Sequence, residues 1–332
     1  MNRIAYQALV LLVCGVTLVG LIAARPLAPS PAPALAASLL PRAQAAAPRS
    51  APAARSPSSA HPAAVQRPSR AALRRALADD PAARVQPRPK APAPRPAPAR
   101  IPGNGPKLRG ALVAQTERLD LYIGKGSFSQ AQVADRAAKL ERVLRAAEDY
   151  FGTTLKHRVS IGFYRVPPKK GVRGMAYTAE RRVELYYRAG EDMGRATTIA
   201  MHELGHHLEA QRYGEQAQRR ADTILHEGMA TWIASIRWLD QCGASSWRER
   251  AQQLRASGVP LKLRTAERYG ADNAYELWAS FVDFLARRYG WDALDKLYAS
   301  GSGRALGSAN YRGVLGKSLD ELADEWRDWV NG

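Results

Sequence analysis

Proline distribution divides this 332-residue chain into two very different parts. Of the 22 prolines, 19 lie between Pro26 and Pro106, and only Pro167, Pro168 and Pro260 follow. Proline lacks a backbone N–H and fixes φ, so a segment this rich in proline builds neither long helices nor the interior of a sheet. We therefore expect residues 25–106 to be a disordered spacer rich in Pro, Ala and Arg. Residues 107–332 hold all seven tryptophans and are expected to form one domain with a hydrophobic core.

An apolar stretch precedes the spacer. Residues 4–24 contain no charged side chain and follow Arg3. Such a run is longer than the usual core of a signal peptide and just long enough to span a bilayer. Residues 1–24 are therefore predicted to be either a cleaved signal peptide or a membrane anchor. Both alternatives place the domain outside the cytoplasm, where it would be periplasmic, membrane-anchored or secreted.

Positive charge is concentrated in the spacer. Of the formal charge of +19, residues 25–106 contribute +11, because 13 Lys and Arg face only Asp79 and Asp80. A solvated, self-repelling linker is the simplest interpretation. Association with anionic lipid or an acidic cell-envelope polymer stays open. No specific nucleic-acid partner is expected, because the segment has neither interleaved aromatic residues nor a known reading motif.

Hydrophobic periodicity predicts an α+β domain, in which a small mixed sheet with a helix is followed by a helical half. Cys242 is the one cysteine of this domain, which excludes an internal disulfide. A helix is expected from the capping residue Ser129 to Tyr150, and a basic loop at residues 169–174. Strands are expected at residues 119–123, 159–166 and 183–187. Further helices are expected at about 195–212, 217–240, 246–256, 273–289, 291–299 and 318–330.

Four of the six histidines lie close together, and two of them belong to the segment His202-Glu203-Leu204-Gly205-His206. Positions four apart share one face of a helix, so both imidazoles can bind the same tetrahedral metal ion. Glu203 can reach a water bound to that ion without being a ligand. Zn²⁺ lowers the pKa of such a water to about 7, and a carboxylate can take its proton during attack. The spacing therefore indicates a hydrolytic zinc site.

A hydrolytic zinc site needs a third protein ligand and leaves its fourth position to water. Glu227 is the main candidate, and we expect it on the next helix, where the small residues Gly228 and Ala230 allow close approach to the first helix. His226 is the rival ligand, about 100° round the same helix. A third alternative is that neither residue binds the metal directly.

The two motifs together resemble a known family. His202-Glu203-Leu204-Gly205-His206 followed by Glu227-Gly228-Met229-Ala230 is similar to the gluzincin group of zinc metallopeptidases. More closely, it resembles bacterial peptidase-MA-like domains, whose second motif is typically E-G-x-A. Residues 275–285 and 288–290 resemble that family's helix after the metal site, and residues 315–326 its closing helix. The sequence departs from the pattern at His226, where the family usually has no histidine, and at Trp278, where a small residue is common.

The resemblance implies a thermolysin-like, zincin-like arrangement of sheet and helices. It implies that His202, His206 and Glu227 hold Zn²⁺ and that Glu203 is the general base. It also implies that a later tyrosine stabilises the oxyanion, with Tyr275 the better placed and Tyr269 in reserve. A tyrosine at a helix start is also commonly a packing residue.

The resemblance also bears on where substrate binds. It implies that the strand at 183–187 is an edge strand lining the substrate cleft, to which a peptide could add as a further strand. An internal position in the sheet is the alternative.

The sequence thus predicts a zinc-dependent metallopeptidase that cleaves a peptide or protein substrate through metal-activated water. The alternative, from another functional class, is a non-catalytic binding or scaffold module of the cell envelope that keeps a metal site on the same fold. Glu203 favours the peptidase, because a purely structural metal site has no need of a base.

Overall fold

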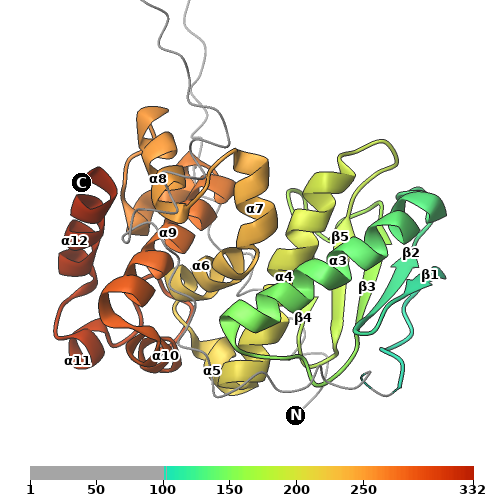
Figure 1. Ribbon diagram of the computed structural model, residues 1–332, viewed down its shortest axis with the longest axis horizontal. Helices are drawn as coiled ribbons and strands as arrows, with labels where there is room; N and C mark the ends of the chain where they lie inside the picture. Colours follow the sequence, from blue (N-terminus) through green and yellow to red (C-terminus); the bar gives the residue numbers. More distant parts are fainter. Residues whose placement is uncertain (1–100, 102) are drawn as a thin grey trace, which may run out of the picture. The chain divides into compact units, whose positions relative to one another are not determined.

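The structure, a computed structural model, describes residue 101 and residues 103–332. The expected leader at 1–24 and nearly all of the expected spacer lie outside these residues. The described part contains one five-stranded mixed sheet and a larger helical half (Figure 1), which confirms the α+β class. None of its helices is long and apolar enough to cross a bilayer.

The sheet has the strand order β1-β2-β3-β5-β4. Its centre is parallel, since β3 pairs in parallel with both β2 and β5, and each edge strand pairs antiparallel with its neighbour. The five strands are β1 (Ala111–Gln115), β2 (Leu119–Ile123), β3 (Val159–Tyr164), β4 (Gly174–Tyr177) and β5 (Arg182–Tyr186).

Two long helices cover one face of the sheet (Figure 1): α3 (Gln130–Phe151) and α4 (Met193–Tyr213). Ser129 begins α3 with a capping box, and the Asp192 side chain caps α4 by accepting from the Gly194 N–H. Alternate residues of the central strands point toward these helices and are buried in the core: Leu119, Leu121, Val159, Ile161, Phe163, Val183 and Leu185.

The helical half follows α4 in the chain. It consists of α5 (Glu215–Arg220), α6 (Thr223–Ile233), α7 (Ser235–Cys242), α8 (Trp247–Ala256), the 3₁₀ helix η1 (Leu263–Tyr269), α9 (Ala271–Tyr289), α10 (Trp291–Ala299), α11 (Tyr311–Leu315) and α12 (Leu319–Asn331). Helix α6 of this half packs against α4 on one side and α9 on the other.

Glycines allow the helices α4, α6 and α9 to pack with their backbones nearly in contact. A Cβ added at Gly205 of α4 would lie 2.9 Å from the Ala230 carbonyl oxygen of α6. A Cβ added at Gly228 would lie 2.7 Å from the Trp278 carbonyl oxygen of α9. Ala230 thus allows the approach to α4 that the sequence predicts, whereas Gly228 serves the other neighbour, α9.

The structure departs from the sequence-based expectations in several elements. The helix expected at 217–240 is divided into α5, α6 and α7. The first break lies at Asp222, whose carboxylate accepts from the Ile224 N–H and the Tyr311 hydroxyl and starts α6, and the second lies at Ala234. Strands β1 and β4, η1 and α11 are short and were not expected. The strand expected at 183–187 lies inside the sheet as β5, so the internal alternative holds and the edge-strand expectation is wrong. The edge at this side is β4.

Contacts with the sheet begin before residue 107, where the domain was expected to start. The Gly105 N–H donates to Asp120 Oδ2 at 2.6 Å, and the Ser160 hydroxyl donates to the Pro106 carbonyl at 2.6 Å. Residues 105 and 106, which the composition assigns to the spacer, therefore pack on the face of the sheet opposite α3 and α4.

Candidate metal centre

Helix α4 presents His202 and His206 on one face, one helical turn apart. Their ring centroids are 4.8 Å apart, with ring planes at 83° to each other. Both side chains are buried where α4 packs between the sheet and α6. The (i, i+4) spacing of the sequence therefore produces the expected pair of neighbouring imidazoles.

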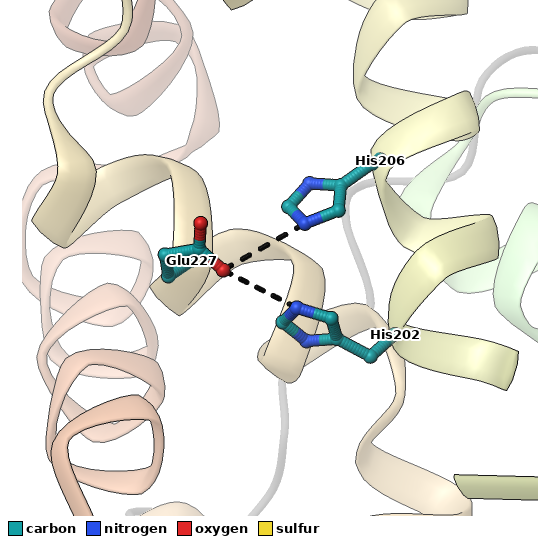
Figure 2. Close-up of side chains that lie close together, drawn as sticks. All are labelled: His202, His206 and Glu227. Atoms are coloured by element: carbon teal, nitrogen blue, oxygen red, sulfur yellow. Dashed lines mark ion pairs between the residues drawn. The ribbon is translucent and has the colours of Figure 1, made fainter. Parts of the chain in front are cut away.

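Glu227 completes a group of three from the second turn of α6. Its Oε2 lies 3.3 Å from His202 Nε2 and 3.7 Å from His206 Nε2 (Figure 2). All three donor atoms lie within 4.8 Å of one another. Figure 2 shows the two imidazole Nε2 atoms and the carboxylate pointing toward a common centre. Two imidazole nitrogens and one carboxylate oxygen form a ligand set typical of catalytic zinc.

Charge in this group favours a cation. Burial alone would raise the pKa of Glu227, but the hydrogen bonds from His202 and His206 outweigh it and hold this pKa well below 4.5. Burial would lower the pKa of His206, yet Glu209 and Glu227 on either side of the imidazole raise it well above 6.5. Negative charge therefore dominates around His206, and a divalent cation fits both the donors and the field.

Glu203 lies on α4 beside the edge strand β4. Its carboxylate accepts a hydrogen bond from the Ala176 N–H, a backbone donor of the sheet edge. Gly174 leaves room for this carboxylate, since a Cβ added there would overlap Glu203 Oε1. Burial raises the pKa of Glu203, and the nearby His202 and His206 partly offset that rise. A raised carboxyl pKa suits a group that takes up and returns a proton.

Tyr275, near the start of α9, reaches the same place. Its ring stacks on His202 with centroids 5.3 Å apart and planes at 5°. The negative charge of Glu227, the burial of the ring and the charge of Glu203 raise the pKa of Tyr275 well above 10, so its hydroxyl keeps its proton and can donate. The reserve candidate Tyr269, at the end of η1, is 43% exposed, and no contact of its ring with His202, His206 or Glu227 occurs within the described residues.

The Nδ1 atoms of the two histidines have different partners. His202 Nδ1 is 3.1 Å from Thr231 Oγ1, a residue of α6. His206 Nδ1 is 2.8 Å from Glu209 Oε2. Hydrogen bonds of this kind fix the orientation of a metal-binding imidazole. Thr231 could not be predicted as a partner of His202, because this contact depends on the packing of α6 against α4.

His226, the rival ligand, is held differently from Glu227. Its ring stacks on His206, with centroids 4.1 Å apart and planes at 22°, and its Nδ1 lies 3.1 Å from Glu209 Oε2. Glu209 and its neighbour in sequence, His207, are both buried, and His207 Nε2 lies 3.3 Å from the Arg182 carbonyl oxygen.

Comparison of the sequence with protein-family models gave no match, and comparison with curated proteins gave none. The functional interpretation therefore rests on the sequence motifs and on the geometry of the described residues.

Zinc bound by His202, His206 and Glu227 is expected to stabilise the fold. At a free zinc concentration of about 100 times Kd, the free energy of unfolding should rise by about 2.7 kcal/mol, which for a domain of this size raises Tm by about 5–10 °C. The measurement is thermal unfolding of the metal-free chain with and without added zinc. His206→Gln should lose the shift, whereas His157→Gln, at an exposed histidine, should keep it. An equal shift in both variants would contradict the assignment.

Proposed function

We propose that this chain is a zinc-dependent metallopeptidase that hydrolyses peptide bonds through metal-activated water. The observation that carries the proposal is the convergence of His202, His206 and Glu227 beside the carboxylate of Glu203, which is not one of the three converging donors. Membership of the peptidase-MA-like group belongs to the proposal and rests on the two motifs. A location outside the cytoplasm belongs to it as well and rests on the apolar run at residues 4–24.

The residues present have separable roles in this chemistry. His202, His206 and Glu227 would hold Zn²⁺, which when bound supplies a lowered water pKa and polarises the carbonyl of the substrate. Glu203 takes the proton of the attacking water and later gives it to the leaving amine. Tyr275 donates its hydroxyl hydrogen to the oxygen that becomes negative as the peptide carbon turns tetrahedral.

Strand β4 is the part of the sheet best placed to align a substrate. It is an edge strand, it packs against α4, and its Ala176 N–H contacts Glu203. An extended peptide added along this edge would bring a backbone carbonyl close to Glu203. This placement favours a peptide or protein substrate bound in an extended conformation, and it transfers to β4 the role that the resemblance gave to the strand at 183–187.

The decisive test of the general base is Glu203→Gln, which keeps the shape of the side chain but removes its basicity. The variant should bind zinc as the parent chain does, while its turnover of a mixed peptide library falls by about 10²–10⁴-fold. Zinc content and hydrolysis should be measured on the same samples. Glu325→Gln, on α12 and paired with Lys317, is the matched control and should retain full turnover.

Two results separate the peptidase from the non-catalytic cell-envelope module. Zinc bound by both chains with hydrolysis by the parent alone supports the peptidase. Zinc bound by both chains with hydrolysis by neither supports a scaffold with a retained metal site.

Tyr275→Phe tests the oxyanion role. The ring can still stack on His202, so the chain should still bind one zinc ion although the hydrogen bond from the hydroxyl to Glu227 is lost. Loss of the single donor should lower kcat by about 10²–10³-fold with little change in KM. Steady-state kinetics on one cleaved peptide provide both constants. A kcat equal to that of the parent would return Tyr275 to a packing role.

A further inference from the structure

His206 has a second set of neighbours on the side of its ring that faces away from Glu227. Glu209 Oε2 lies 2.8 Å from His206 Nδ1 and 3.1 Å from His226 Nδ1, so a single carboxylate oxygen contacts both imidazoles. Glu209 comes from the turn of α4 after His206, and His226 comes from α6. The contact therefore joins the two helices that carry the ligands.

The protons in this cluster are fixed by its geometry. A carboxylate accepts hydrogen bonds and donates none, so the imidazole nitrogen that faces it carries the hydrogen. Glu209 thereby holds the proton on His206 Nδ1, and Nε2, which faces Glu227, is the nitrogen whose hydrogen a metal ion would displace. Glu209 thus selects the tautomer of His206 that can bind a metal at Nε2.

The plane of the His206 ring is restrained as well. The His226 ring stacks on it at 4.1 Å, and His226 Nδ1 in turn lies 3.1 Å from Glu209 Oε2 and 3.2 Å from the Tyr298 hydroxyl oxygen. An imidazole with a carboxylate at its edge and a second ring on its face has little freedom to rotate about χ2.

Glu209 has few partners besides these two imidazoles. It is fully buried, its ion-pair partners are His206 and His226, Gln218 Nε2 lies 3.5 Å from its Oε2, and its Oε1 has no hydrogen-bond partner among the described residues. Positive charge on the two imidazoles, or on a cation bound beyond the His206 ring, would compensate the buried carboxylate.

We propose, building on the metal site of the proposed function, that Glu209 and His226 form a positioning pair that fixes the tautomer and ring plane of His206 and so sets the affinity of the chain for its metal ion. His226 is in this account a support for a ligand rather than a ligand. The pair acts on metal binding whether or not the chain hydrolyses peptides.

A second metal ion is the competing interpretation of the same cluster, since donor atoms of His206, Glu209 and His226 also lie within 4.8 Å of one another. Two metal ions would require His206 to bind through both ring nitrogens and to lose both of its ring protons. The single-proton arrangement needs no such step, which is why we favour the positioning pair. The stoichiometry of bound zinc distinguishes the two.

The experiment measures zinc affinity and stoichiometry on the full chain, by competition with a chromophoric chelator at pH 7, together with the visible spectrum of the Co²⁺ form. Glu209→Gln and His226→Phe should each weaken zinc binding by about 10–100-fold at one ion per chain. His226→Phe keeps an aromatic ring against His206 and removes the N–H. The Co²⁺ spectrum should shift in both variants, because the His206 ring is no longer held.

His207→Gln is the matched control. His207 is a buried histidine of the same helix that contacts the Arg182 carbonyl, and the zinc affinity of this variant should stay at the parent value.

Thermal unfolding of the metal-free variants separates positioning from general damage to the fold. Glu209→Gln keeps the size of the side chain and one acceptor oxygen, so the metal-free variant should still unfold in a single cooperative transition, and yet it should lose affinity. Unchanged zinc affinity in both Glu209→Gln and His226→Phe would overturn the proposal. A stoichiometry of two zinc ions per parent chain that falls to one in His226→Phe would also overturn it. Loss of zinc binding in His226→Phe, together with parent affinity in Glu227→Gln, would overturn it as well. Intact zinc binding with these affinity shifts but no hydrolysis would refute the peptidase and leave the positioning pair standing.

Discussion

The close packing of α4 against α6 is the contact on which the rest of the site depends. Gly205 has no side chain, so the backbone of α4 approaches Ala230 of α6, and this approach brings Glu227 to within 3.3 Å of His202. Thr231 reaches His202, and His226 reaches Glu209, across the same contact. Because interiors pack at the density of organic crystals, a shift of even one methyl group at this contact would be felt at the ligands.

Charge gives the second constraint. Glu203, Glu209 and Glu227 are carboxylates brought close together around His202, His206 and His226, and the ion-pair partners of Glu209 and Glu227 are histidines rather than lysine or arginine. Hydrogen bonds keep Glu227 ionised, and although burial would raise the pKa of Glu209, His226 and His206 lower it to about 2. Such an arrangement is unfavourable without a strong positive charge, and a divalent cation among the Nε2 atoms and Glu227 is the simplest one that fits.

The local parts of this site could be read from the sequence. The spacing of His202 and His206 places both on one helix face regardless of tertiary structure, and the capping residue Ser129 sets the start of α3. The position of Glu227 was predictable only through a resemblance and the small residues beside it. The partners Thr231, Ala176 and Tyr298 could not be predicted, because each acts through a contact between elements. The start of α6 at Asp222 depends on the distant Tyr311, and the short strand β4 carries too few residues to show a period.

His202, His206 and Glu227, three donors on two helices, are proposed to surround a single metal ion. X-ray absorption at the zinc edge of the zinc-loaded chain tests this arrangement most directly, because it gives the number of donor atoms and their distances from the metal. We expect only nitrogen and oxygen donors at about 2.0–2.1 Å, with the multiple-scattering signal of two imidazoles. The signal of three imidazoles, or of none, would contradict the assignment of His202, His206 and Glu227 as the ligands.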